Sequence, residues 1–140
     1  MKMYENILIM TVGLPRSGKS TWAKKQNIPI VNCDSIRLAL HGRAFIKEAE
    51  KMVWTIAKYM VIALFYAGHK KVILDATNFS QARRDEWVDG RWSCKYINFK
   101  TSKKVCLKRA EDNEDLKDII DWMSEFIKFP TKDLYNRKRT

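Results

Sequence analysis

The stretch Gly13-Leu14-Pro15-Arg16-Ser17-Gly18-Lys19-Ser20 decides the fold of this chain. It matches the pattern G-x-x-x-x-G-K-[ST] at every fixed position, and Thr21 follows it directly. An apolar run, Ile7 to Val12, precedes it, and a segment of helical character begins at Lys19. The two glycines allow a tight curl whose main-chain N–H groups point inward, where they can bind phosphate oxygens. The sequence therefore predicts a phosphate loop between a strand and a helix, a site for a nucleoside triphosphate.

The loop residues are expected to bind the nucleotide together. Lys19 can reach the β- and γ-phosphates, and the Ser20 hydroxyl is placed to bind Mg²⁺. We therefore expect ATP, or another nucleoside triphosphate, together with Mg²⁺. The residues expected to hold the nucleotide are Gly13, Leu14, Pro15, Arg16, Ser17, Gly18, Lys19, Ser20 and Thr21.

Length and composition indicate one soluble globular domain, residues 1–140, with a basic surface. The chain has 140 residues, of which 46% are hydrophobic and 31% are charged, and this is enough for an ordinary core. Its 27 Lys and Arg against 16 Asp and Glu give a net charge of +11, which favours a polyanionic partner such as nucleic acid. Alternatively, the positive charge serves only to keep a small kinase soluble, and ATP is the only polyanion that it binds.

Cysteine usage and hydropathy favour a cytoplasmic setting. The three cysteines, Cys33, Cys94 and Cys106, include no C-x-x-C pair, so neither a disulfide framework nor a zinc site is indicated. The residues before Ile7 leave no room for a signal peptide. The most apolar helical stretch, 52–67, is interrupted by Lys58 and is shorter than a membrane span. We therefore expect no membrane association.

Apolar strands alternate with helical segments along the whole chain. Strands are expected at 7–12, 29–32, 72–74 and 96–99, and helices at 19–26, 35–41, 44–67, 81–88, 103–111 and 116–128. The alternation predicts an α/β fold with a parallel sheet of about four strands and helices on both faces. The basic tail, about 130–140, is expected to be flexible. Trp54, Trp87, Trp92 and Trp122 are expected to pack in the core rather than to stack on bases.

Two carboxylates end strands at the edge of the sheet where the phosphate loop lies. Asp34 follows the second strand and can accept the proton of an attacking hydroxyl, and Arg37 can bind a phosphate of the acceptor. Equally, Asp34 can be only a helix cap and Arg37 one surface cation among many. Asp75 ends the third strand and can orient Mg²⁺, while Thr77 and Asn78 suit acceptor contacts. The alternative for this second group is an ordinary turn.

Arg109 ends the penultimate helix, beside Lys108 and ahead of an acidic connector. In a nucleotide kinase, a small helical lid at this point, near the C-terminal third, would bring an arginine onto the transferred phosphoryl group. A solvated cation at a helix end explains the residue nearly as well.

The sequence resembles the kinase domain of the phage-type polynucleotide 5′-kinases, a branch of the phosphate-loop kinase superfamily. Besides the loop, the resemblance rests on Asn32-Cys33-Asp34-Ser35-Ile36-Arg37 and on Asp75-Ala76-Thr77-Asn78-Phe79-Ser80 followed by Arg83, Arg84 and Trp87. It implies ATP-dependent transfer of the γ-phosphoryl group to the 5′-hydroxyl of DNA or RNA. Asp34 would be the general base, Lys19 and Ser20 would bind the donor, and Arg37 would bind the acceptor phosphate. Arg109 matches the lid arginine, and Arg83 joins Asp75, Thr77 and Asn78 in the expected acceptor site.

Two departures from that family are visible. The family carries a carboxylate directly before its Thr-Asn pair, where this chain has Ala76 and its own carboxylate one position earlier, at Asp75. Such lids often carry a second arginine one turn after the first, where this chain has Asn113. The first departure bears on acceptor specificity, and the second on stabilisation of the transferred phosphoryl group.

The favoured interpretation is a stand-alone polynucleotide kinase that acts on nucleic-acid 5′ ends. It would lie in the cytoplasm, that of the host if a phage encodes the chain, and it could form homo-oligomers. One alternative is a kinase of the same superfamily that acts on a small metabolite or a nucleotide. Another is a module that binds nucleotide or nucleic acid with little transfer.

Overall fold

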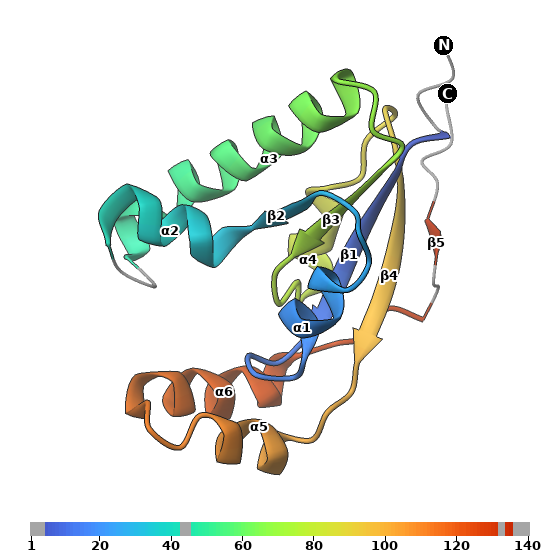
Figure 1. The fold of residues 1–140 in the computed structure, drawn as a ribbon. Coiled ribbons are helices and arrows are strands. Elements are labelled where there is room, and N and C mark those ends of the chain that lie inside the picture. Colours follow the sequence, from blue (N-terminus) through green and yellow to red (C-terminus); the bar gives the residue numbers. More distant parts are fainter. Residues whose placement is uncertain (1–4, 43–45, 132–133, 136–140) are drawn as a thin grey trace.

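The structure, a computed structural model, describes residues 5–42, 46–131 and 134–135. Its elements in chain order are β1 (Ile7–Gly13), α1 (Lys19–Lys24), β2 (Ile30–Asn32), α2 (Cys33–His41), the 3-10 turn η2 (Lys47–Ala49), α3 (Glu50–Tyr66), β3 (Lys71–Asp75), α4 (Gln81–Asp85), β4 (Ser93–Phe99), α5 (Lys103–Arg109), α6 (Glu114–Phe126) and β5 (Leu134–Tyr135). Figure 1 shows the strands in the middle of the molecule, with α5 and α6 beyond the carboxyl ends of the parallel strands.

The sheet has the order β2-β3-β1-β4-β5, and its first four strands are parallel. This confirms the predicted four-stranded parallel α/β sheet. Asn32 pairs in register with Asp75, and Gly13 with Phe99, so the phosphate loop and the ends of β2 and β3 meet at one edge. β5 was not predicted; it pairs antiparallel with Cys94 and Lys95 of β4. The rest of the predicted flexible tail lies largely outside the described residues.

The two faces of the sheet carry separate apolar cores. Leu8, Met10 and Val12 of β1 pack in a cluster that includes Val53 and Ala57 of α3. Ile9 lies on the other face, with Ala23 of α1 and Ile73 of β3. A parallel sheet is buried on both faces, so consecutive strand residues, which point to opposite faces, are both apolar. The prediction of helices on both faces is confirmed.

The tryptophan prediction holds only in part. Trp87 and Trp92 are each 2% exposed and belong to the main core, and the partly buried Trp54 packs against it. For Trp122, on α6, the prediction was wrong, because 53% of this residue is exposed.

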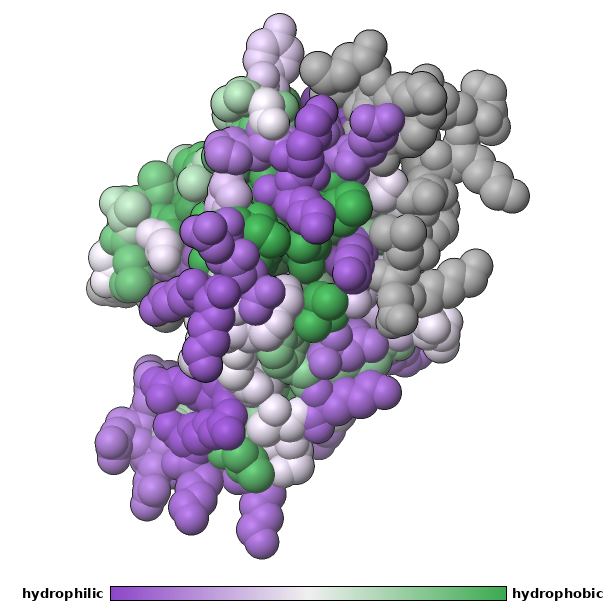
Figure 2. Space-filling model, turned by 45° about the vertical axis from the view of Figure 1, so that its right-hand side comes forward, coloured by the Kyte–Doolittle hydropathy of each residue, from purple (hydrophilic) through white to green (hydrophobic). Residues whose placement is uncertain are grey.

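α5 and α6 form a helical pair in the place predicted for a lid. The pair has its own core, made of Leu14, Cys106, Ala110, Ile120 and Met123. Because Leu14 belongs to the phosphate loop, this core joins the pair to the loop. Figure 2 shows hydrophilic side chains over most of this lower lobe, and a notch separates the lobe from the rest of the molecule.

Several helix boundaries differ from the prediction. α3 begins at Glu50 rather than at 44, because Ile46 is extended (φ −135°) and η2 follows it; residues 43–45 lie outside the described part. α2 begins two residues earlier than predicted, because the Asn32 side chain caps it by accepting a hydrogen bond from Ser35 N. The helix cap is therefore Asn32 and not Asp34. In the described part of the chain, no helix is long and apolar enough to cross a membrane.

Candidate active site

The phosphate loop leaves β1 at Gly13 and enters α1 at Lys19. Ser17 N donates to Leu14 O at 3.1 Å, which closes the turn, and Gly13 N donates to Thr77 O at 3.1 Å. Gly18 has a φ of 102°, which favours glycine. A Cβ atom on Gly13 would lie 2.7 Å from Ser17 Oγ and 2.8 Å from Phe99 O. Both fixed glycines of the motif are therefore required by the shape of the loop.

The Lys19 ammonium group lies inside this loop. It donates to Leu14 O at 2.5 Å and to Ser17 Oγ at 3.3 Å, and the residue is 7% exposed. Burial lowers its pKa to about 8, although the nearby carboxylates of Asp75 and Asp34 oppose this shift. A phosphate group in the loop would offer the ammonium an anionic partner and stabilise its charged form.

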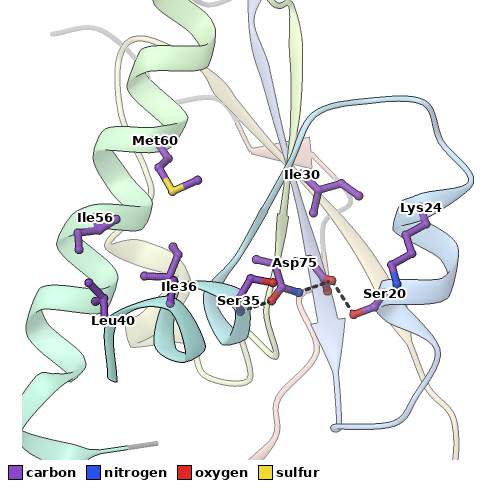
Figure 3. A pocket seen from close by; sticks show the side chains of 11 residues that line it. Ser20, Lys24, Ile30, Ser35, Ile36, Leu40, Ile56, Met60 and Asp75 are labelled. Atoms are coloured by element: carbon purple, nitrogen blue, oxygen red, sulfur yellow. Dashed lines mark hydrogen bonds between the residues drawn. The ribbon is translucent and has the colours of Figure 1, made fainter. Parts of the chain in front are cut away.

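Ser20 and Asp75 form a pair of oxygen ligands beside the loop. Ser20 Oγ donates to Asp75 Oδ2 at 2.7 Å, and Asn32 Nδ2 donates to the same oxygen at 2.8 Å (Figure 3). Within the described ranges, no three or more His, Cys, Asp or Glu residues are arranged so that they could hold a metal ion. One carboxylate and one hydroxyl fit Mg²⁺, which commonly binds one or two protein oxygens together with substrate phosphates and water.

A cavity of about 560 Å³ extends from this pair between α1 and the helices α2 and α3. Figure 3 shows Ser20 and Asp75 at one end and the apolar side chains of Ile36, Leu40, Ile56 and Met60 on the opposite wall. Asp34 and Arg37 are not among its lining residues. The cavity therefore adjoins the predicted metal site, while the predicted general base lies outside it.

Asp34 and Arg37 lie together at the start of α2. The Asp34 side chain is 74% exposed, and its Oδ1 accepts from Arg37 Nη1 at 2.7 Å. Arg37 also donates from Nε and Nη2 to the two oxygens of Glu50, at 2.9 and 2.7 Å. Burial alone would lower the pKa of Arg37, but the hydrogen bonds and charge of Glu50 raise it above its usual value. Arg37 thus uses three of its five N–H groups inside the protein, and the other two have no hydrogen-bond partner in the described part of the chain.

The other residues expected in an acceptor site occupy different environments. Asn78 is 1% exposed and its Nδ2 donates to Thr11 O at 2.8 Å, so its side chain points into the fold and braces the loop after β3. Thr77 is partly buried beside the phosphate loop. The Arg83 guanidinium stacks on Trp54 at 4.2 Å and pairs with Glu86 at 3.3 Å. Arg83 therefore lies where α4 packs against α3.

Arg109 is joined to the phosphate loop through Arg16. Arg109 Nη1 donates to Arg16 O at 3.0 Å, and Arg16 Nη1 donates to Arg109 O at 2.9 Å. The structure thus brings the end of α5 to the loop, as the lid interpretation of Arg109 requires.

Three residues of the site were given no role by the sequence reasoning. Asn32 binds Asp75 and caps α2, and it lies inside a motif where only the aspartate and arginine had been assigned roles. Glu50 holds Arg37, and Arg84 Nη1 donates to Asn78 O at 2.8 Å. The position of Asn32 directly before a helix was a usable signal, since asparagine is a favoured N-cap. Glu50 and Arg84 had no comparable signal.

The sequence of residues 8–120 matches the family described as AAA domain. The chain belongs to this AAA domain family. No curated protein sequence matches this chain.

Several solved structures share the fold of this chain. A chain in the "Structure of Pnkp1/Rnl/Hen1 complex" is 29% identical with a TM-score of 0.66, over 76% of this chain and 40% of that one. A chain in the "Structure of the Pnkp1/Rnl/Hen1 RNA repair complex" is 22% identical with a TM-score of 0.62, over 92% and 49%. A gluconokinase from Sinorhizobium meliloti is 17% identical with a TM-score of 0.53, over 94% and 79%. This AAA domain is a phosphate-loop kinase-like domain, and it spans less than half the length of the first two chains.

Proposed function

We propose that this chain is an ATP-dependent kinase that transfers the γ-phosphoryl group to the 5′-hydroxyl of a DNA or RNA end. The observation that carries the proposal is the position of Asp34. Its carboxylate is exposed, is held by Arg37, and lies just after Asn32, which ends β2 and pairs in register with Asp75. Its charge also opposes the lowering of the Lys19 pKa by burial. An exposed carboxylate beside the donor phosphates is what a hydroxyl acceptor requires as a general base.

Each residue then has a role that its contacts support. Asp34 orients the acceptor hydroxyl and takes its proton, while Lys19 and Arg109 neutralise charge on the phosphoryl group. Ser20 and Asp75 would hold Mg²⁺, which supplies further neutralisation of the donor phosphates when bound. Arg37, Arg83 and Thr77 face the acceptor, and Asn78 supports the loop that carries Thr77. Lys19 and Ser20 follow β1, Asp34 follows β2, and Asp75 ends β3, so these four residues start from one edge of the sheet, which supports this division.

The nucleic-acid acceptor is supported by charge and by likeness. The net charge of +11 favours a polyanion over a small neutral substrate. The chain that is 29% identical comes from the Pnkp1/Rnl/Hen1 complex, and the chain that is 22% identical comes from a complex described as an RNA repair complex. We infer a cytoplasmic location from the three free, buried cysteines. We also propose that the chain can form homo-oligomers.

The test uses ATP labelled in the γ-phosphate, Mg²⁺ and a short oligonucleotide with a free 5′-hydroxyl. The same oligonucleotide, already phosphorylated at that end, is the control. Label is expected only on the free end, and Asp34→Asn is expected to abolish transfer while ATP binding persists. Label on neither oligonucleotide, with ATP binding intact, would reject the polynucleotide acceptor.

A second candidate, a kinase of a small acceptor, is favoured by one observation. The cavity of about 560 Å³ beside Ser20 and Asp75 has the size and apolar walls of a small-molecule site. Salt separates the two candidates, because affinity for a polynucleotide falls steeply with ionic strength, whereas affinity for a small neutral acceptor does not. If the wild type transfers no label and Asp34→Asn binds its ligands as the wild type does, a binding module without transfer is favoured instead.

A further inference from the structure

Arg16 adopts a main-chain conformation that is unusual for an arginine. Its φ is 65°, in the left-handed region that glycine and asparagine occupy more readily. The residue is exposed, and it belongs to the loop that is expected to surround the donor phosphates. A non-glycine residue held in this region at a functional loop suggests that its side chain has a role there.

Arg16 and Arg109 hold each other in place across the mouth of the loop. Each guanidinium donates from Nη1 to the main-chain oxygen of the other residue, at 2.9 and 3.0 Å, so the two side chains run past each other. Neither forms an ion pair with a carboxylate in the described part of the chain. Each guanidinium therefore keeps four further N–H groups, and two neighbouring positive charges favour an anion close to them.

The helical pair itself lacks a second arginine for the transferred group. Asn113 stands one turn after Arg109, and its Oδ1 caps α6 by accepting from Leu116 N at 3.0 Å. Lys117 is bound to Glu114 at 2.9 Å. The arginine that contacts Arg109 is therefore on the loop, at Arg16.

We propose that Arg16 is a second catalytic arginine, which contacts the phosphoryl group during transfer and takes the place of the arginine missing at Asn113. This inference rests on the proposed phosphoryl transfer. In that step the acceptor oxygen bonds to the γ-phosphorus, and the hydroxyl proton passes to Asp34. The bond from the γ-phosphorus to the β,γ-bridging oxygen breaks, and its electron pair stays on that oxygen, which leaves with ADP. A guanidinium anchored in the loop stabilises the negative charge on the transferred and leaving oxygens.

The decisive variant is Arg16→Gly, because glycine adopts the φ of 65° without strain and the fold is therefore expected to be preserved. We expect kcat to fall about 100-fold, the usual effect of removing one donor to a transition-state oxyanion. The Kd for ATP is expected to change less than about threefold, since Lys19 and the main chain still bind the phosphates. Lys70→Ala is the matched control, because it removes one exposed positive charge before β3, at the opposite edge of the sheet.

A second measurement does not depend on the acceptor. The Kd for ADP with Mg²⁺ is measured with and without aluminium fluoride, which mimics the phosphoryl group in transfer. The role of Arg16 would be supported if aluminium fluoride tightens ADP binding to the wild type and to Lys70→Ala but not to Arg16→Gly. This measurement needs no acceptor, so it remains valid if no oligonucleotide is labelled. In that case the acceptor named in the proposed function is wrong, but the role of Arg16 stands.

Other results would overturn the inference. They are an unchanged kcat in Arg16→Gly, retention of the fluoride effect in that variant, or absence of the effect in the wild type. A purely structural role would instead lower the free energy of unfolding of Arg16→Gly and raise its Kd for ATP and for ADP, with the fluoride effect intact.

Discussion

Arg37 and Glu50 form a two-pronged ion pair, with Nε to Oε2 at 2.9 Å and Nη2 to Oε1 at 2.7 Å, that joins α2 to α3. Their side chains are only 13% and 18% exposed, whereas that of Asp34, on the other side of Arg37, is 74% exposed. The two partners of one guanidinium are therefore expected to matter in different ways. Glu50 fixes the arginine, and Asp34 remains available for chemistry.

Glu50→Ala is expected to lower the free energy of unfolding by about 3 kcal/mol, because it leaves a largely buried guanidinium without its main partner. Asp34→Asn is expected to cost less than about 1 kcal/mol, since an exposed pair contributes little. Urea unfolding of the two variants measures both values. Equal costs would show that the burial of the pair does not decide its contribution.

Lys19 is expected to make nucleotide binding depend on pH. Its pKa in the folded protein is about 8, below the ordinary 10.5, so the ammonium loses its proton as the pH rises through 8. Phosphate binds the charged form, so ATP affinity is expected to fall above pH 8, and binding is expected to take up a proton in that range. Calorimetry in buffers of different ionisation enthalpy measures this uptake. Lys19→Arg, which stays charged, should show none; equal uptake in that variant would assign the proton to another group.

Asp75→Asn is expected to raise the Mg²⁺ concentration for half-maximal activity at least tenfold, because it removes the only negative charge of the Ser20–Asp75 pair. ATP binding without Mg²⁺ should be kept, since no ligand of the phosphates is lost. Activity measured against Mg²⁺ at fixed ATP tests this. Asn32→Ala is the comparison, because it removes one hydrogen bond to Asp75 but no charge. A shift as large in Asn32→Ala would mean that hydrogen bonding, not charge, sets the Mg²⁺ dependence.

Gly13→Ala is expected to destabilise the fold by about 1–3 kcal/mol, because its Cβ would lie 2.8 Å from the Phe99 carbonyl oxygen, which strand pairing holds in place. ATP binding should weaken with it. Gly90→Ala is the control, since a Cβ there meets nothing within 4 Å and the substitution is expected to be neutral. Unfolding of the two variants by urea gives the comparison. Similar stability of both would show that β1 and β4 can separate at this point.

Structural features that depend only on a short stretch of sequence were predictable. The phosphate loop follows from fixed residues, and Ser80 and Ser102 cap α4 and α5 as serines before helices usually do. Gly68, with a φ of 107°, lies just after the end of α3, as expected of a helix-ending glycine. In these cases, the residues that determine the structure are close neighbours in the chain.

Features that depend on partners far apart in sequence were not predictable. The Arg37–Glu50 pair, the support of Asn78 by Arg84 and the meeting of Arg16 with Arg109 appear only when the elements pack. Trp122 shows a different limit of sequence patterns. Its place in an apolar helical pattern favoured burial, but α6 contributes Ile120 and Met123 to the core and leaves Trp122 at the surface. Periodicity identifies an apolar side of a helix without showing which residues will be covered.

Leu14 gives the loop a mechanical connection to the helical pair. It is 5% exposed and lies in the core between α5 and α6, while Thr101, just before α5, donates to Ser17 O at 2.9 Å. The two helices therefore cannot swing outward as an independent flap without drawing the loop with them. A displacement of the loop on binding phosphate is therefore expected to shift α5 and α6 as well, out to the outer surface of α6.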